Sequence, residues 1–481
     1  MFEERYRSHH DAEQRLAALL NDSRRTKTRA AGPPPLLQNL MRSGAGRRLL
    51  RLGGMLGLKP PAGRWKALEK ILLHPADNPA PPSALTGAPQ NAPEPAGVYI
   101  HVPYCDKICS FCNLNRRGCS GVDLDDYAAA LITEIKAWGR YPYIQRRRFE
   151  SVYFGGGTPT VLRAAQLSAV LAALRDNFPL SADCEISIES TQHNLPGEKA
   201  AVLQKAGVNR LSIGIQTLSE RGRVLLGRTY SEERAREELR LLRETFGGVL
   251  GIDIIYSYPG QTLDELRRDA DFCAASGIDS VSFYSLMIQK GSALSNTIEA
   301  GRLQFERDIA FDLERHNLFY STLREAGFTL LELSKLARPG RDRYRYIHIQ
   351  YGEGDLVPIG HGAGGNIAGF PLYSPAPGQR MTGSPQPEYR QFHRLLGMLQ
   401  FGVYDPERLC AGLDETRKQA AGASASATAA AAAATAAMRE FEAEGLLLPA
   451  PDGKSWTPSA DGVFWGNNIA VAVLERIAGA R

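Results

Sequence analysis

The sequence predicts an α/β fold. We expect a partial (β/α)6 barrel, open on one side, with a basic N-terminal arm before it and a mostly helical C-terminal domain after it. Strand-like and helix-like runs alternate six times between Val98 and Leu286, and this order implies a parallel sheet with right-handed crossovers. Residues capable of chemistry follow several strand-like runs, at the edge where such barrels place their active sites. Six units are too few for a closed eight-stranded barrel, so we expect an open side that admits a large, flat substrate.

The first 71 residues form the basic arm, because they hold 15 Lys and Arg against 6 Asp and Glu. The remainder is slightly acidic, since the net charge of the whole chain is only +5. We interpret the arm as a solvated, partly helical tail or, alternatively, as a segment that meets an anionic partner or surface. No nucleic-acid recognition motif accompanies its charge, so we expect no nucleic-acid partner.

A linker follows at residues 72–96, where seven prolines favour an extended chain, and the catalytic domain is expected at residues 97–370. The N-terminus is charged and lacks an apolar signal core, and no segment has the character of an integral membrane helix. Seven cysteines, three of them in one loop, favour metal chemistry in a reducing compartment over a secreted disulfide framework. We therefore predict a cytoplasmic protein.

The barrel units are read from short β-branched or aromatic runs, each followed by a helix-favouring run. The predicted strands are Val98–Val102, Ser151–Phe154, Glu185–Glu189, Leu211–Ile215, Gly251–Ile255 and Ser280–Leu286. The predicted helices are Leu124–Trp138, Ala164–Asn177, Gly197–Lys205, Glu232–Thr245 and Thr262–Ala275. The C-terminal domain, residues 371–481, is expected to be helical or winged, with helices at 385–410, in the Ala-rich segment 411–437 and in a charged segment from Arg439.

Three cysteines, Cys105, Cys109 and Cys112, form a C-x3-C-x2-C array directly after the first predicted strand. Three thiolates so close together can face a shared metal centre, and iron–sulfur clusters are normally held by four cysteines. Three ligands from one loop leave one iron with an open position, which separates a catalytic site from a closed structural one. Two alternatives stay open at this point: a closed zinc site with Cys119 as fourth ligand, or inert buried thiols.

With Tyr99 before it and Phe111 inside it, the array resembles the signature of the radical S-adenosylmethionine (SAM) enzymes. The version YIHVPYC is similar to the branch that contains oxygen-independent coproporphyrinogen III dehydrogenase, and the likeness extends over about residues 97–365. The resemblance implies a radical SAM barrel and a [4Fe–4S] cluster bound by the three cysteines. It also implies a SAM molecule that chelates the open iron and is cleaved by an electron from the cluster.

The resemblance further implies binding sites for two SAM molecules. The first would be held by Gly156, Glu189 and the backbone at Phe111, and the second by Gly157, Thr158, Gln216, Arg228 and Asp253, with Tyr99, Met287 and Gly364 as further cofactor-binding residues. Simpler interpretations exist for some of these residues: a glycine run can be a tight turn, and a strand-end carboxylate can be solvated. Asp253 is informative by itself, because a carboxylate in an apolar β run is costly unless it is satisfied.

Two later segments bear on the substrate. Glu332–Ile349 contains an Ala-Arg-Pro but is otherwise basic and aromatic. We interpret it either as a carboxylate-binding surface or as a solvated loop. Asp355–Gly365 reads DLVPIGHGAGG and resembles the GxGAGG segment of the heme-degrading radical SAM methyltransferases, the anaerobilin synthase type. Within it, His361 is either an iron ligand or proton donor to a macrocycle, or a loop histidine satisfied by the protein.

These resemblances predict an enzyme of anaerobic heme use and iron acquisition, a C-methyltransferase that methylates heme and opens it to a linear tetrapyrrole with release of iron. A flavodoxin- or ferredoxin-type electron donor is the expected partner. Two other functions remain open: oxygen-independent coproporphyrinogen III oxidation, and heme delivery by a chaperone. No acid–base catalytic residue is assigned from the sequence.

Overall fold

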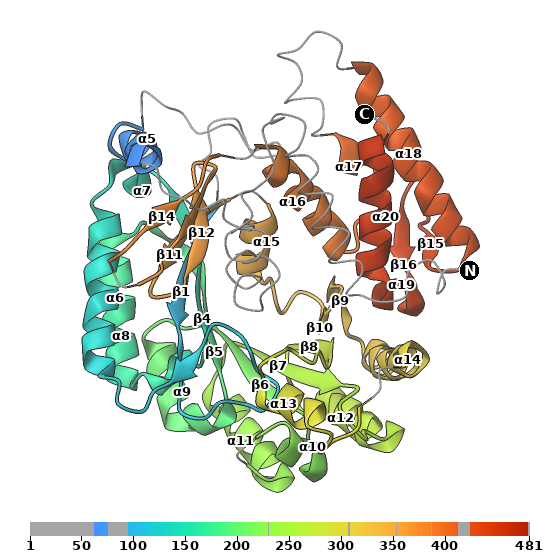
Figure 1. Cartoon of the computed structure of the whole chain (residues 1–481), viewed down its shortest axis with the longest axis horizontal. Helices are drawn as coiled ribbons and strands as arrows, with labels where there is room; N and C mark the ends of the chain where they lie inside the picture. Colours follow the sequence, from blue (N-terminus) through green and yellow to red (C-terminus); the bar gives the residue numbers. More distant parts are fainter. Residues whose placement is uncertain are drawn as a thin grey trace.

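The computed structural model describes residues 62–75, 95–228, 230–305, 308–352, 354–376, 378–385, 387–411 and 424–479. At its centre is a 12-stranded sheet with the order β14-β13-β12-β11-β1-β4-β5-β6-β7-β8-β10-β9, which curves into an open arc (Figure 1). Neighbouring strands from β11 to β8 pair in parallel. These parallel strands are β11 (Asp355–Ile359), β1 (Pro95–Val102), β4 (Arg148–Gly156), β5 (Leu180–Ser190), β6 (Arg210–Gln216), β7 (Val249–Tyr256) and β8 (Ser280–Ser285).

The partial-barrel prediction is confirmed, and the sequence missed one parallel strand. All six predicted strands are present, but β11 adds a seventh beside β1, with Ile100 opposite Ile359. Short antiparallel strands extend both edges, so the sheet ends without closing on itself. They are β12 (Gly364–Ile367), β13 (Phe370–Tyr373) and β14 (Met381–Thr382) on one side and β10 (Lys335–Ala337) and β9 (Thr329–Glu332) on the other.

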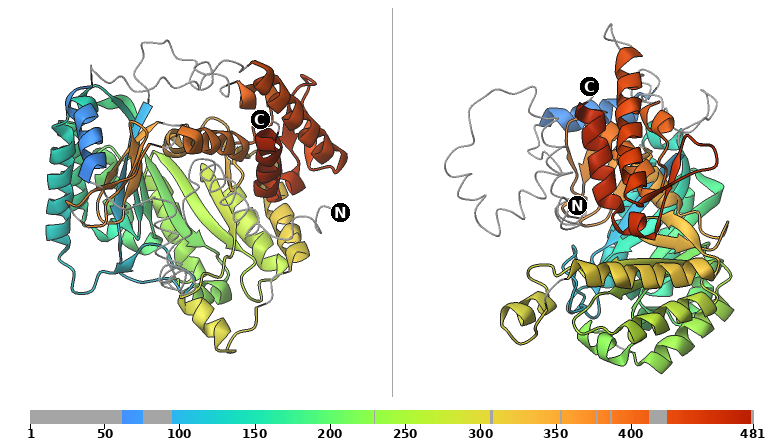
Figure 2. Two further views of the ribbon diagram at one scale, coloured as in Figure 1. Left: turned by 45° about the horizontal axis from the view of Figure 1, so that its top comes forward. Right: turned by 90° about the vertical axis from the view of Figure 1, so that its right-hand side faces the viewer.

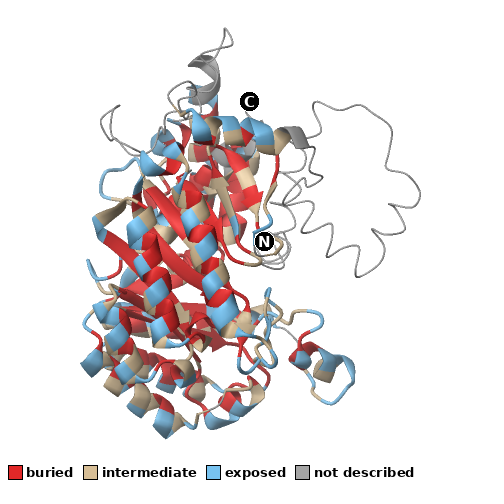
Figure 3. Cartoon of the chain, turned by 90° about the vertical axis from the view of Figure 1, so that its left-hand side faces the viewer, coloured by how far each residue is buried: buried red, intermediate tan, exposed pale blue. Residues whose placement is uncertain are grey.

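Helices cover the outer, convex face of the arc (Figure 1). They are α6 (Leu124–Gly139), α8 (Ala164–Asn177), α9 (Gly197–Lys205), α11 (Glu232–Thr245) and α12 (Leu263–Ala275). Three shorter helices are α7 (Pro142–Gln145), α10 (Glu220–Leu225) and α13 (Ala293–Glu299), of which α10 and α13 adjoin the loop that follows β1. Side chains define several starts: Asp123 accepts two backbone N–H bonds before α6, and Thr262 forms a capping box with Glu265 before α12. Figure 3 shows the buried residues along the sheet and exposed residues on the outer faces of the helices.

The concave side of the arc holds α15 (Arg345–Tyr351), which contacts β1, β4 and β11. The ring of Tyr346 stacks on Tyr153 with ring centroids 4.2 Å apart. Below it, Arg210 and Asp342 form a two-point ion pair with both side chains fully buried. A packed interior, rather than an empty channel, therefore fills one end of the open barrel.

The C-terminal helices have an apolar cluster of their own, distinct from that of the sheet. They are α16 (Pro387–Gln400), α17 (Pro406–Cys410), α18 (Ser424–Ala443), α19 (Ala460–Phe464) and α20 (Gly466–Gly479), with the hairpin β15 (Leu447–Pro449) and β16 (Trp456–Pro458). α18 and α20 lie side by side (Figure 2). The Ala-rich and charged segments predicted as separate helices join in α18, and β13 and β14 carry the sheet beyond residue 370.

Most of the predicted arm and linker, residues 1–61 and 76–94, lies outside the described residues. The described remainder is α5 (Ala62–Leu73), which crosses the expected boundary at residue 71. Leu68 and Leu72 of α5 are fully buried in the main core, so this end of the arm is packed against the barrel rather than solvated. No helix among the described residues is long and apolar enough to span a membrane.

Candidate active site at the strand ends

The loop that carries Cys105, Cys109 and Cys112 leaves the carboxyl end of β1. We call residues 103–119 the cluster loop. Its two ends are joined by β2 (Tyr104–Cys105) and β3 (Arg117–Gly118), which pair in parallel. The Cys112 N–H donates to the Cys109 carbonyl over 3.2 Å, and the Cys119 N–H donates to the Cys105 carbonyl over 2.9 Å. These bonds fold the three predicted ligands into one compact turn.

The cluster loop is anchored to the far side of the sheet through Ser110. Its N–H donates to the Leu226 carbonyl (3.3 Å), and its hydroxyl donates to the Leu225 carbonyl (2.6 Å). Its own carbonyl accepts from the N–H of Leu294 in α13 (2.8 Å). Phe111 packs against a small apolar cluster that includes Leu226 and Leu294. The loop therefore spans the mouth of the arc, from the carboxyl end of β1 to the segment after α10.

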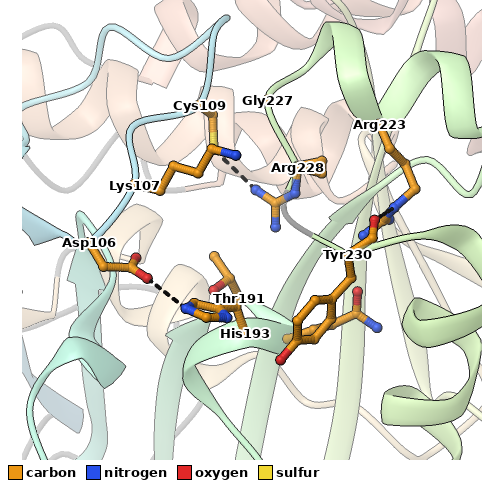
Figure 4. Close-up of a pocket in the computed structure, with 10 residues that line it drawn as sticks. Asp106, Lys107, Cys109, Thr191, His193, Arg223, Gly227, Arg228 and Tyr230 are labelled. Atoms are coloured by element: carbon orange, nitrogen blue, oxygen red, sulfur yellow. Dashed lines mark hydrogen bonds and ion pairs between the residues drawn. The ribbon is translucent and has the colours of Figure 1, made fainter.

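Two cysteine sulfurs receive hydrogen bonds from predicted cofactor residues. Arg228 Nη1 donates to Cys109 Sγ over 3.1 Å (Figure 4), and Thr158 Oγ1 donates to Cys105 Sγ over 3.5 Å. Burial raises the pKa of the Cys105 thiol, and the Thr158 bond acts in the opposite direction. The described residues contain no group of three His, Cys, Asp or Glu side chains placed to hold a single metal ion. Three thiols on one loop, with donors aimed at the sulfurs, fit a larger iron–sulfur cluster.

The turn after β4 brings Thr158 to the cluster loop, and it requires glycine. Gly156 has φ +114°, and a Cβ there would lie 2.7 Å from the His101 ring. A Cβ on Gly157 would lie 2.6 Å from the Tyr104 carbonyl oxygen. The N–H groups of Gly157 and Thr158 donate to the carbonyls of Val102 and Tyr104, each over 2.8 Å. Close backbone approach thus explains the glycines locally, in addition to any ligand role.

Glu189, at the end of β5, faces the same turn. Its Oε1 accepts from the Tyr153 hydroxyl over 2.7 Å, and its Oε2 accepts from the Gly156 N–H over 3.3 Å. Burial raises the pKa of this carboxyl to about 7, and repulsion from Asp253 acts in the same direction. Glu189 is therefore no solvated surface charge, and a carboxylate held in this way can accept hydrogen bonds from a bound ligand.

Gln216, Arg228 and Asp253 converge on Gly214 in β6. Arg228 Nη2 donates to the Gly214 carbonyl, and Gly214 lies opposite Asp253 in the pairing of β6 with β7. A Cβ on Gly214 would lie 2.8 Å from Gln216 Nε2, so the missing side chain leaves room for the glutamine. Gln216 itself has φ +74°, an uncommon conformation for a residue other than glycine.

Three other predicted residues take different positions. Tyr99 points its hydroxyl at His101 Nδ1 (2.9 Å), while His101 Nε2 donates to the Asn115 carbonyl (2.9 Å). Met287 is 53% exposed after β8, and Gly364 is exposed at the start of β12. In the described part of the chain, no hydrogen bond links Met287 or Gly364 to the other predicted site residues.

The GHGAGG segment follows β11 and touches the cluster loop. Gly362 has φ +92°, and a Cβ there would lie 2.1 Å from Asn115 Nδ2. His361 Nε2 accepts from Arg117 Nη2 over 2.8 Å. Because Nε2 accepts this bond, the ring proton lies on Nδ1. Burial lowers the pKa of His361, and the neighbouring Arg117 acts in the same direction. The structure therefore favours the loop-histidine interpretation.

The arginines of Glu332–Ile349 bind the protein's own groups. Arg338 donates to the carbonyls of Ala274 and Ile278, and Arg341 donates to Asp279 over 2.8 Å. Arg345 pairs with Asp183. These three side chains hold the segment against α12 and β5, so neither a carboxylate-binding surface nor a simple solvated loop describes them.

Two residues of the concave side, Tyr153 and Lys335, were missed in the sequence. Tyr153 donates to Glu189 and stacks on Tyr346, which belongs to the basic and aromatic segment singled out in the sequence. Lys335 is buried over the Tyr344 ring, 4.9 Å from its centroid. The one available signal was a charged residue, Arg210, at the start of an otherwise apolar strand. Its partner Asp342 lies 132 positions away, so only the fold joins them.

The comparisons with known proteins agree with this geometry. The model of the radical SAM superfamily matches residues 99–273. The heme chaperone HemW of Escherichia coli K12 is 30% identical over 282 residues, which cover 58% of this chain and 71% of HemW. The chain belongs to the radical SAM superfamily. Membership implies a [4Fe–4S] cluster and SAM as cofactors.

Other radical SAM proteins show where this chain lies within the superfamily. A mouse mitochondrial protein, radical S-adenosyl methionine domain-containing protein 1, is 34% identical over 58% of this chain, and the match covers 62% of its own length, less than two thirds. Anaerobilin synthase of E. coli O157:H7 is 30% identical over 57% of this chain and 61% of that protein. The structure of coproporphyrinogen III oxidase (HemN) from E. coli superposes with a TM-score of 0.65 at 23% identity, over 79% of this chain and 90% of HemN. The chain thus belongs to the HemN-like branch of radical SAM proteins. HemW, anaerobilin synthase and HemN carry heme- or porphyrin-related names, whereas the mouse protein does not.

Proposed function

We propose that this radical SAM protein is a methyltransferase that methylates heme and opens it to a linear tetrapyrrole with release of iron. The observation that carries the proposal is the convergence of Gln216, Arg228 and Asp253 on Gly214, directly beside the cluster loop. These residues match the positions that hold a second SAM in the resembling branch. One SAM as radical source and another as methyl donor give the two activities that the reaction needs.

In this proposal, Cys105, Cys109 and Cys112 hold the cluster. When bound, the cluster and SAM supply the one-electron chemistry that cleaves a carbon–sulfur bond. Glu189 would accept hydrogen bonds from the first SAM, because the Tyr153 hydroxyl and the Gly156 N–H hold its carboxylate in position. The stacked rings of Tyr99, Tyr153 and Tyr346 close the barrel beneath the site and exclude water from it.

Heme is the proposed substrate for two reasons. The segment GHGAGG, which resembles the heme-degrading methyltransferases, lies against the cluster loop through Gly362 and His361. A relative named anaerobilin synthase is 30% identical to this chain over 276 residues. We further propose a flavodoxin- or ferredoxin-type protein as electron donor and a reducing, cytoplasmic setting, because a low-potential iron–sulfur cluster needs both.

The test is the mass of the pigment after anaerobic turnover. Reconstituted protein, dithionite, heme and SAM with a deuterated methyl group are incubated under nitrogen, and the products are separated and weighed by mass spectrometry. The proposal expects a tetrapyrrole that has gained a labelled methyl group and lost iron. Asp253→Asn is expected to reduce this product more than about tenfold, whereas Asp271→Asn, an exposed carboxylate on α12, leaves it unchanged. Loss of carboxyl groups from coproporphyrinogen, without methyl transfer, would instead establish an oxidoreductase.

A heme chaperone is the second candidate, and one observation favours it: the match to HemW covers 71% of that chaperone, more than the 61% covered in anaerobilin synthase. A chaperone would return heme unchanged in mass and pass it to an added apo-hemoprotein. Iron retention and transfer in the same assay would therefore decide for this candidate.

A further inference from the structure

The cysteines of the cluster loop are not equivalent, because one of them receives a charged hydrogen bond. Arg228 Nη1 donates to Cys109 Sγ over 3.1 Å (Figure 4), whereas Cys105 Sγ accepts only from the neutral Thr158 hydroxyl at 3.5 Å. No side-chain donor reaches Cys112 Sγ among the residues that the structure describes. Hydrogen bonds from a charged donor are roughly twice as strong as neutral ones, so the Arg228 contact is the dominant one.

The position of Arg228 is fixed from both ends of its side chain. Its backbone N–H donates to the Arg223 carbonyl over 2.8 Å, and its Nη2 donates to the Gly214 carbonyl. The preceding Gly227 has φ +73°, and a Cβ there would lie 3.1 Å from the Ser110 N. The backbone before Arg228 therefore lies directly on the cluster loop, and the guanidinium is held at Cys109 rather than swinging freely.

The charge of Arg228 is not neutralised by a carboxylate. No Asp or Glu of the described residues forms an ion pair with it. The pocket beside it is lined by two further cations, Lys107 and Arg223, and by one carboxylate, Asp106, which pairs with His193 over 3.1 Å (Figure 4). Burial lowers the pKa of Arg223 to about 10, and repulsion from Arg228 acts in the same direction. The environment of Cys109 is thus net positive, and it favours the state of the cluster that carries more negative charge.

We propose that Arg228 raises the reduction potential of the cluster through its N–H···S bond to Cys109. The inference rests on the proposed role of the three cysteines as ligands, and it assigns Arg228 a task separate from its predicted contact with SAM. Hydrogen bonds to ligand sulfurs and local charge are among the factors that set such potentials. Reduction adds one electron from a low-potential one-electron donor, and no bond or proton changes place in this step.

A redox titration of the full chain without SAM tests the proposal, because SAM then does not compete for the guanidinium. The reduced cluster is quantified by EPR at fixed potentials in wild type and Arg228→Gln. At the wild-type midpoint we expect about tenfold less reduced relative to oxidised cluster in Arg228→Gln, equivalent to about 59 mV for a one-electron couple. Arg221→Gln is the matched control: it removes an arginine of α10 that pairs with Glu265, and it leaves the midpoint unchanged.

A second measurement uses the wild-type protein and so does not depend on the folding of a variant. With ¹⁵N-labelled arginine, pulsed EPR of the reduced cluster is expected to show coupling to an arginine nitrogen, and Arg228→Lys in the same medium is expected to lose it. A wild-type midpoint in cluster-loaded Arg228→Gln, or no arginine coupling in the wild type, overturns the inference. Wild-type protein without iron and sulfide would instead overturn the proposed function, so the two failures are distinguishable.

Discussion

The two ends of strand β6 differ in how their charged side chains are buried and paired. At its start, Arg210 is fully buried and donates two hydrogen bonds of 2.9 Å to the Asp342 carboxylate. At its end, Gln216 and Arg228 gather around Gly214 beside the cluster loop, and both side chains remain partly accessible. One strand thus separates a charged pair that stabilises the fold from the charged and polar groups of the proposed cofactor site.

The difference follows from what covers each end. Arg210 lies under the Tyr344 ring, 4.4 Å from its centroid. Tyr344 directly precedes α15 on the concave side. At the carboxyl ends lie the cluster loop, the glycine turn after β4 and α13, whose Leu294 N–H donates to the Ser110 carbonyl. In parallel barrels this edge is the site of function, whereas the opposite edge serves stability.

The largest expected effect comes from a substitution in the cluster loop, at the carboxyl end of the sheet. Cys105→Ala removes one of only three proposed cluster ligands, so we expect loss of the cluster and of SAM cleavage to below detection. Iron and sulfide analysis of anaerobically purified protein measures the first, and the release of 5′-deoxyadenosine measures the second. Cys119→Ala is the matched control and is expected to retain both, because Cys119 is held in the loop through its backbone: its N–H donates to the Cys105 carbonyl and its carbonyl accepts from the Val122 N–H. Cluster loss in Cys119→Ala would revive the closed four-cysteine site.

The next largest effect is expected from a substitution of Arg210, at the start of β6. Arg210→Met leaves the Asp342 carboxylate buried without its main partner, and we expect a loss of about 3–5 kcal/mol in the free energy of unfolding. Urea denaturation measures it. Arg240→Gln, which removes an exposed arginine of α11, is expected to leave the denaturation midpoint unchanged. Folded, cluster-loaded Arg210→Met should still cleave SAM at the wild-type rate, and a selective loss of cleavage would mean that the two ends of β6 are coupled.

Glu189 refines the comparison, because it is a carboxyl group at the carboxyl edge of the sheet whose pKa is raised by burial. Glu189→Gln removes a charged acceptor, so SAM binding is expected to weaken by about 10- to 100-fold, measured by equilibrium dialysis. The carboxyl pKa is about 7 in the folded protein, above the ordinary 4.5. The folded state therefore binds the extra proton, and the stability that this group contributes is lost as the pH rises from about 4.5 through 7. Glu189→Gln should remove this part of the pH dependence of unfolding, and an unchanged profile would contradict the assigned pKa.

The sequence predicts the parallel core well because each strand and helix has a local signal. Alternation of β-branched runs and helix-favouring runs predicts β1 and β4 to β8, and the cysteine spacing identifies the cluster loop. β11 was missed, since DLVPI is short and its partner β1 lies 259 residues earlier in the chain. The same limit applies to the site: the predicted residues share an edge, but the bond from Arg228 to Cys109 and the pairing of Arg338 with the end of α12 depend on contacts that only the folded chain creates.

The smallest expected effect concerns His361, whose ring lies at the functional edge but is held by the protein. His361→Ala removes the acceptor for Arg117 and is expected to cost about 0.5–1 kcal/mol in the free energy of unfolding, because the bond is partly exposed. Arg117→Gln is expected to cost the same, and the double variant no more than either single change, since both disrupt one interaction. The absorption spectrum of added heme should be unchanged in His361→Ala. A shift of the heme Soret band in this variant alone would instead identify His361 as an iron ligand and assign the GHGAGG segment to substrate binding.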